Sequence, residues 1–341
     1  MCYLEKGLTV IVPVYNVELY VEQCILSILS SNINNLKVIV VDDHGTDNSM
    51  NVVRQMATKD TRIKIIQNDK NRGLAYSRNH GIDAVETTHL AFLDSDDWVS
   101  PDFYDKLYEA SLASDVDISV GNVIYTYPET GVRREEWVSW WSFHSGHSLL
   151  DTVEKKQDII YACACWNKVY RTDFIKKNRC YFPIGLFIED VPFTFLTTAL
   201  SNKIKLVKEV ELYYRQRSNS IMKDLKKSRR IFDVFKIMDL CYESLKYIEK
   251  QEQGEYRKIL DHFWIFNLYS WLSAVCHDDY DEFYSEMRKR YVAINIADNQ
   301  YITPEHMKIY TSIINTNDDY DVYLFGILRL GKMKSSSWLL K

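Results

Sequence analysis

Three carboxylates follow one short apolar run. The segment Ala91–Trp98 reads Ala-Phe-Leu-Asp-Ser-Asp-Asp-Trp and carries Asp94, Asp96 and Asp97. Acids so close together repel one another unless a cation lies between them. A hard cation such as Mg2+ or Mn2+ prefers carboxylate oxygens and needs few protein ligands where substrate phosphates supply the rest. The spacing therefore favours a metal-assisted nucleotide site; the alternative is a solvated acidic turn that caps a helix beginning near Pro101.

The elements that must position these acids alternate regularly along the first part of the chain. Predicted strands cover 8–14, 37–41, 62–66, 89–93 and 116–120, and predicted helices cover 18–31, 47–58, 74–85 and 101–114. Strict alternation of strand and helix predicts βαβ units, and continuous apolar strands predict helices on both faces of the sheet. The expected fold class is α/β, with a Rossmann-like, mostly parallel central sheet.

Polar residues follow three of the predicted strands. Tyr15 and Asn16 follow the first, Asp42 and Asp43 the second, and Asp94 begins the cluster after the fourth. The carboxyl ends of parallel strands meet at one edge, where open α/β sheets bind ligands. Adjacent side chains point in different directions, so one of Asp42 and Asp43 is expected to meet a ligand, for example the ring N–H of uracil, while the other holds the turn.

Gly73 opens the predicted helix that carries Arg78. A helix N-terminus and a guanidinium are both suited to bind a phosphate. An ordinary surface charge is the alternative for Arg78.

Composition restricts the classes of protein. Of 341 residues, 46% are hydrophobic and 26% are charged, with a formal net charge of -5. This balance argues against nucleic-acid binding, which needs a basic surface. No apolar run reaches the length of about 18 residues that a membrane span requires, and residues 1–6 lack the features of a signal peptide. We therefore expect a cytoplasmic protein, whose seven cysteines are reduced.

Taken together, four segments resemble those of family 2 glycosyltransferases with the GT-A fold. In order, they are 11–16, 40–49, 73–81 and 92–98. The resemblance extends over residues 7–220 and includes 166–171 and 189–193, which resemble segments of bacterial capsule, exopolysaccharide and lipopolysaccharide transferases. One departure is His44-Gly45, where relatives carry Gly-Ser after the two acids; it leaves open the local turn and any contact from His44.

The resemblance implies a nucleotide-sugar donor, with UDP expected, and a divalent metal, Mn2+ or Mg2+. In the donor pocket it implies that Pro13 and Tyr15 line the uracil and ribose, with Asn16 nearby. Asp43 is expected to contact the base, beside Asp42.

In the D-x-D element, the resemblance implies that Asp96 binds the metal directly. Asp94 is expected to reach the ribose or sugar hydroxyls, or the metal through water, and Ser95 belongs to the same donor-binding set. Asp97 is expected to cap the following turn.

The later segments are expected to supply the catalytic and acceptor residues. The resemblance implies that Asp190 is the catalytic base of an inverting reaction and that Glu189 orients it or binds the acceptor. A helix cap is the alternative for this pair. Arg215 and Arg217 are expected to approach the diphosphate, with structural ion pairing as the alternative. Trp166 and Lys168 are candidates to border the acceptor.

The expected domains are a GT-A catalytic domain over 1–222 and a helical region over 223–341. The first would comprise a nucleotide-sugar half over 1–120 and an acceptor half over 121–222. The aromatic insertion Trp137–Trp141 is either an acceptor platform or part of the core. The mixed apolar and basic segment 323–334 would pack against a partner, as in a homodimer, or contact a membrane.

These expectations describe an inverting, metal-dependent enzyme that transfers a hexose or N-acetylhexosamine to a hydroxyl of a glycan or lipid-linked oligosaccharide in bacterial surface polysaccharide synthesis. Peripheral attachment to the inner face of the plasma membrane would fit such an acceptor. Two alternatives stay open: a polyprenyl-phosphate glycosyltransferase, whose ionised acceptor needs no base, and an inactive nucleotide-sugar-binding protein.

Overall fold

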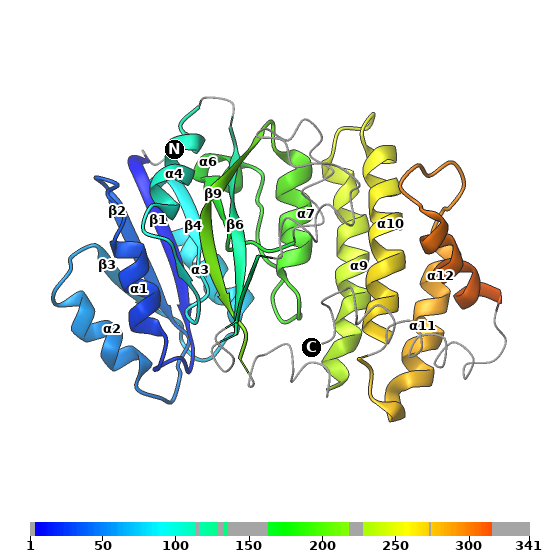
Figure 1. Ribbon diagram of the computed structural model, residues 1–341, viewed down its shortest axis with the longest axis horizontal. Coiled ribbons are helices and arrows are strands. Elements are labelled where there is room, and N and C mark those ends of the chain that lie inside the picture. Colours follow the sequence, from blue (N-terminus) through cyan, green and yellow to red (C-terminus); the bar gives the residue numbers. More distant parts are fainter. Residues whose placement is uncertain are drawn as a thin grey trace. The chain divides into compact units, whose positions relative to one another are not determined.

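The chain divides into two units, Met1–Arg217 and Ser218–Lys341 (Figure 1). The computed structural model describes residues 4–113, 116–127, 132–135, 163–217, 228–272 and 274–315. The domain boundary predicted at residue 222 lies outside these residues, as do Trp137–Trp141 and 323–334.

One mixed sheet forms the centre of the first unit. Its described strands lie in the order β3-β2-β1-β4-β8-β6-β9-β5, with β7 beside β6. The strands are β1 Glu5–Val14, β2 Leu36–Asp42, β3 Ile63–Gln67, β4 Thr87–Phe92, β5 Trp98–Val99, β6 Ile118–Tyr127, β7 Val132–Glu135, β8 Lys168–Arg171 and β9 Ile204–Arg215.

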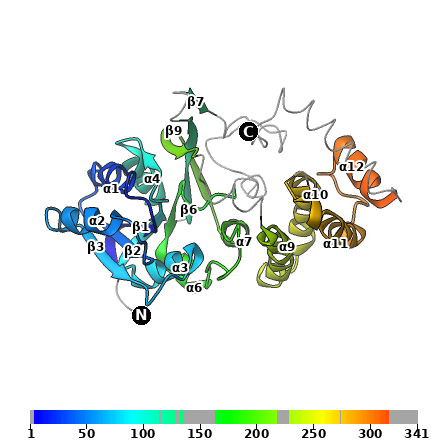
Figure 2. The same ribbon diagram turned by 90° about the horizontal axis from the view of Figure 1, so that it is seen from below.

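Strands β3, β2, β1 and β4 form the parallel part of this sheet. The last eight residues of β1 are all buried, because helices cover both faces: α3 and α6 lie on one side, and α1 and α4 on the other (Figure 2). The helices of the unit are α1 Val21–Leu29, α2 Ser49–Ala57, α3 Leu74–Ala84, α4 Phe103–Ser111, α6 Thr172–Lys177 and α7 Asp190–Leu200.

The fifth predicted strand, 116–120, corresponds to β6, but it does not extend the parallel set. Strand β8 lies between β4 and β6 and is antiparallel to both. The regular βαβ order therefore ends at β4, because a strand from much later in the chain enters the sheet there. Strand β9 then pairs in parallel with β6.

Two glycines fix the position of helix α3. Gly73, directly before the helix, has φ +84°, a left-handed conformation that favours glycine. Gly81 faces β1 so closely that a Cβ atom would lie 2.4 Å from Cγ2 of Ile11. The small residue lets α3 pack against the sheet near the strand ends.

The described part of the second unit is helical. Its helices are α9 Asp233–Ser244, α10 Gln253–Leu272, α11 Tyr280–Ala293 and α12 Pro304–Asn315. Aromatic rings lie in its core. The ring centres of Phe235 of α9 and Phe283 of α11 are 4.7 Å apart, and Trp264 of α10 is buried. Among the described helices of both units, none has the length and apolar character needed to span a membrane.

Candidate active site

The ends of β1, β2 and β4 bring the predicted donor-side residues to one edge of the sheet. Pro13 is buried and lies beside Val41 of β2. Asp42 and Asp43 come next in the chain, and Asp94 follows the end of β4, the neighbour of β1 on its other side. The three polar clusters therefore share one edge, as the strand pattern predicts.

The loops after β1 and β2 are joined by hydrogen bonds. Thr46 N–H donates to Asn16 Oδ1 at 2.7 Å, and Glu18 N–H donates to Asp47 Oδ2 at 2.9 Å. Asn16 itself has φ +52°. These hydrogen bonds join the two loops and hold Tyr15, which is 47% exposed, at the edge of the site.

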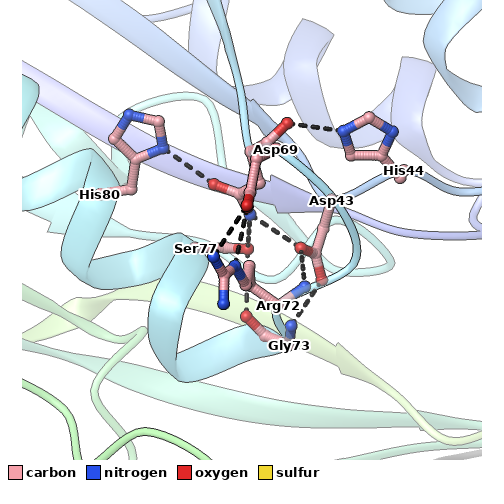
Figure 3. Close-up of polar contacts among 8 residues, drawn as sticks. Asp43, His44, Asp69, Arg72, Gly73, Ser77 and His80 are labelled. Atoms are coloured by element: carbon pink, nitrogen blue, oxygen red, sulfur yellow. Dashed lines mark hydrogen bonds and ion pairs between the residues drawn. The ribbon is translucent and has the colours of Figure 1, made fainter.

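Asp42 and Asp43 are both buried and turn to different partners. Asp42 accepts the backbone N–H of His44 at 2.9 Å. Asp43 accepts the backbone N–H groups of Arg72 at 2.7 Å and Gly73 at 2.9 Å (Figure 3). Asp43 thus ties the end of β2 to the start of α3, while its contact with a base stays a prediction.

His44 resolves the turn that the sequence left open. It has φ +57°, and its Nε2 lies 2.6 Å from the carbonyl oxygen of Asn68. The Asn68 side chain donates to Asp43 Oδ1 at 2.7 Å and to Ser77 Oγ at 2.9 Å, and its Oδ1 lies 2.8 Å from Nδ1 of His80. Asn68 was missed in the sequence, although it directly follows β3 at the same edge, and the rule used for the other strand ends could have found it.

The acidic turn after β4 separates its carboxylates. Asp97 is fully buried, and its Oδ1 accepts the backbone N–H of Arg215 at 2.8 Å. Burial and the charges of Asp96 and Asp94 raise the pKa of Asp97 well above its usual range. Asp97 therefore anchors the end of β9, while Ser95 is buried inside the turn.

The two arginines predicted to meet a diphosphate both reach this turn. Arg217 Nη2 lies 2.5 Å from Asp96 Oδ2, and Arg215 Nε donates to the carbonyl oxygen of Asp96 at 2.8 Å. The Arg215 guanidinium lies 4.3 Å from the ring centre of Trp98 and 4.8 Å from that of Tyr20. Trp98, the last residue of the acidic segment, and Tyr20, which the sequence analysis missed, thus support the arginine by cation–π contact.

Arg78 joins the acids from two distant parts of the chain. Its Nη2 lies 2.6 Å from Asp94 Oδ1 and its Nη1 lies 2.8 Å from Glu189 Oε1. The residue is only 2% exposed. The guanidinium predicted to hold a phosphate is therefore engaged at both ends by carboxylates.

Asp190 is the first residue of α7 and Glu189 is its N-cap residue. Burial and the neighbouring Glu189 charge raise the pKa of Asp190 to about 7. Ile188 has φ +60°, a strained conformation for a β-branched residue. Strain two residues before an acid with a shifted pKa is typical of a functional site.

The two candidate acceptor residues are buried. Trp166 stacks on Tyr214 with 5.2 Å between the ring centres. Lys168 Nζ donates to Asn167 Oδ1 at 2.8 Å and to the carbonyl oxygen of Ala164. Burial lowers the pKa of Lys168 to about 8. Contact of either side chain with an acceptor stays a prediction.

The acids of the turn fit a metal that arrives with its own ligands. Within the described residues, no group of three or more His, Cys, Asp or Glu side chains is arranged to hold an ion. Asp94 and Asp96 offer hard carboxylate oxygens, and Mg2+ commonly takes one or two such ligands together with substrate phosphates and water.

Comparison with known proteins agrees with this architecture. Residues 9–178 match the family described as Glycosyl transferase family 2. The chain is 28% identical over 277 residues to the putative glycosyltransferase EpsH of Bacillus subtilis, covering 79% of this chain and 76% of EpsH. It is 29% identical over 251 residues to glycosyltransferase GlyG of Streptococcus pneumoniae, covering 71% and 83%. It is 30% identical over 226 residues to GlyA of the same organism, covering 64% of this chain but only 32% of GlyA.

Solved structures share the fold. S. aureus TarS in complex with UDP-GlcNAc superposes with a TM-score of 0.75 at 22% identity, covering 95% of this chain and 92% of that chain. The mannosyltransferase PcManGT from Pyrobaculum calidifontis, in complex with GDP-Man and Mn2+, gives a TM-score of 0.52 at 12% identity, covering 98% and 88%. The chain therefore belongs to glycosyltransferase family 2 and is a glycosyltransferase of the GT-A fold.

Proposed function

We propose that this enzyme transfers a hexose or N-acetylhexosamine from a UDP-linked donor to a hydroxyl of a bacterial surface glycan, with inversion at the anomeric carbon. The complex of TarS with UDP-GlcNAc supports the donor class. Similarity to the Bacillus subtilis minor teichoic acid biosynthesis protein GgaB, 27% identical over 232 residues, supports the acceptor class.

The observation that carries the proposal is the bridge formed by Arg78. One guanidinium contacts Asp94, on the donor side, and Glu189, next to the proposed base Asp190. Direct displacement needs a donor-binding group and a base on opposite sides of one small space. The contacts of Arg78 with acids from the end of β4 and the start of α7 support this arrangement.

In this proposal, the nucleoside lies along the ends of β1 and β2. Pro13, Tyr15 and Asn16 border the uracil and ribose, and Asp43 accepts the ring N–H of the base, with Asp42 holding the turn. The exposed ring of Tyr15 supports this assignment.

The diphosphate lies by the acidic turn. Arg215 and Arg217 approach its oxygens. Asp94 reaches the ribose or sugar hydroxyls, or the metal through water, and Ser95 belongs to the same donor-binding set. Asp96 would hold a divalent metal, Mn2+ or Mg2+, which would neutralise charge on the leaving diphosphate. The presence of Mn2+ in the PcManGT complex supports a metal here.

The chain's own chemistry is proton transfer. Asp190 takes the proton of the acceptor hydroxyl as the hydroxyl oxygen attacks the anomeric carbon on the face opposite the diphosphate. The bond from the anomeric carbon to the diphosphate oxygen breaks, and UDP leaves. Since the pKa of Asp190 is raised to about 7, the carboxylate is a stronger base than an ordinary aspartate and is still substantially ionised at neutral pH. No covalent enzyme intermediate is needed.

Release of UDP from a panel of UDP-sugars, with and without Mn2+, in the presence of a glycan acceptor tests this function. We expect metal-dependent release with one donor or a few related donors. Metal-dependent binding of UDP without turnover of any donor would contradict the proposal and favour an inactive binding protein.

A further inference from the structure

Arg78 is buried and is contacted from several sides. It lies on α3, which Gly81 packs against β1, and its guanidinium lies 5.2 Å from the ring centre of Phe182. The neighbouring Asn79 makes two hydrogen bonds of 2.8 Å with the backbone of Phe182. Phe182 in turn stacks at 4.0 Å on Phe193 of α7. These contacts hold helix α3 against the segment that leads into Glu189 and Asp190.

Carboxylates already engage both terminal nitrogens of Arg78. Its buried Nε has no hydrogen-bond partner among the described residues. Charged and titratable groups surround the nearby Asp190 from several elements. They are Glu189 beside it, Arg78 on α3, Asp94 after β4, Lys168 and Tyr170 on β8, and Cys163 and Cys165 before β8.

We propose that Arg78 is a positioning residue for the transfer reaction: it fixes the donor-side Asp94 relative to the Glu189–Asp190 turn. The inference rests on the proposed function of this site. Asp94 lies 16 positions and Glu189 lies 111 positions from Arg78 in the sequence. Because one planar guanidinium contacts both, it sets the distance between the donor and the base. A lysine keeps the charge but, as a point charge on a flexible stem, cannot hold two carboxylates in fixed directions.

The test compares wild type, Arg78→Lys, Glu189→Gln and the double variant in kcat and in the dissociation constant of UDP. Each single change is expected to lower kcat by about 10- to 100-fold, the range for a small misplacement of reacting groups. The kcat of the double variant is expected to be no lower than that of the less active single variant, because both changes weaken the same contact between Arg78 and Glu189. The UDP dissociation constant should stay within about twofold of wild type.

Arg62→Lys is the matched control. Arg62 also holds a carboxylate with two nitrogens, donating to Asp60 from Nε at 3.0 Å and Nη2 at 2.7 Å, but it lies at the start of β3, away from the site. Its kcat should remain within about twofold of wild type.

Three results would overturn the inference: wild-type kcat in Arg78→Lys, losses that multiply in the double variant, or weakened UDP binding at unchanged kcat, which would assign Arg78 to the phosphates. If Arg78→Lys does not fold, Glu189→Gln is used alone, because it weakens the same ion pair and keeps the cation. A wild-type unfolding midpoint together with wild-type kcat in Glu189→Gln would then overturn the inference. Thermal unfolding of the four proteins gives a readout without turnover, and simply additive losses of midpoint would refute the coupling. A wild type that transfers no sugar would contradict the proposed function but leave this unfolding test in force.

Discussion

Arg217 holds Asp96 through an ion pair of 2.5 Å, on the carboxylate that we propose as the metal ligand. The backbone oxygen of the same residue accepts a hydrogen bond from Arg215. Both arginines are the proposed partners of the diphosphate. Their pairing with Asp96 neutralises the acid and keeps them beside the place that the phosphates would take.

Arg217→Ala should therefore separate metal binding from catalysis. Without the competing cation, we expect Asp96 to bind Mn2+ about 2- to 5-fold more tightly in the absence of nucleotide. This range corresponds to the free energy of a partly exposed ion pair. Sugar transfer should fall, because a phosphate ligand is lost. Calorimetric titration with Mn2+ and a steady-state assay measure the two effects, and unchanged Mn2+ affinity together with full activity would contradict this role.

Asp190 should give transfer an acid limb near neutral pH. Burial and the Glu189 charge raise the pKa of Asp190 to about 7, so kcat/KM should fall about tenfold for each pH unit well below that value. Glu189→Gln removes the repulsion and should move the midpoint to lower pH. A pH profile of both proteins is the check, and a midpoint unmoved by the change would argue against this cause.

The same shift predicts a pH-dependent cost to stability. The native state binds the Asp190 proton more tightly than the unfolded state, so the stabilisation is complete below pH of about 4 and lost as the pH rises through about 7. Asp190→Asn stays neutral at all pH values. The unfolding free energy of this variant relative to wild type should therefore rise by at least about 1 kcal/mol from pH 4 to pH 8. Urea unfolding at the two pH values measures the difference; an equal offset at both would contradict the shift.

Asn68→Ala should loosen the donor side of the site. The change removes the side-chain bonds to Asp43 and Ser77, and leaving such buried groups unpaired costs about 1 to 3 kcal/mol. We expect a higher KM for the donor with a smaller change in kcat. Asn71→Ala, at an exposed position nearby, is the control, and equal effects of the two changes would remove Asn68 from this role.

Gly81→Ala should destabilise the enzyme by about 1 to 3 kcal/mol, because the added methyl would overlap Ile11. Gly254, in the first turn of α10, has open space around a Cβ atom. Gly254→Ala should instead stabilise by about 0.4 to 1 kcal/mol. Chemical denaturation of both variants tests the contrast in sign.

The local pattern predicted the elements of the parallel half closely. The strand expected over 37–41 is β2 Leu36–Asp42, and the helix expected over 74–85 is α3 Leu74–Ala84. Apolar runs and helix boundaries are local properties, so they can be read from neighbouring residues. The place of β8 between β4 and β6 could not, because strand pairing across a long separation leaves no periodic signal.

The candidate site follows the same division. Strand ends predicted the shared edge of Asp42, Asp43 and Asp94, since parallel strands impose it. The contact of Arg78 with Glu189 crosses 111 positions, and only the folded packing of α3 against the segment before α7 creates it. A phosphate partner was therefore the natural expectation for Arg78 from its local sequence.

The most direct test of the central claim is transfer by Asp190→Asn with the donor and metal that wild type prefers. Asp173→Asn, at an exposed carboxylate of α6, serves as the control. We predict that kcat falls by about 100- to 10,000-fold in Asp190→Asn and stays near wild type in Asp173→Asn. Near-normal turnover by Asp190→Asn would contradict base catalysis by this residue and favour an acceptor that is already ionised.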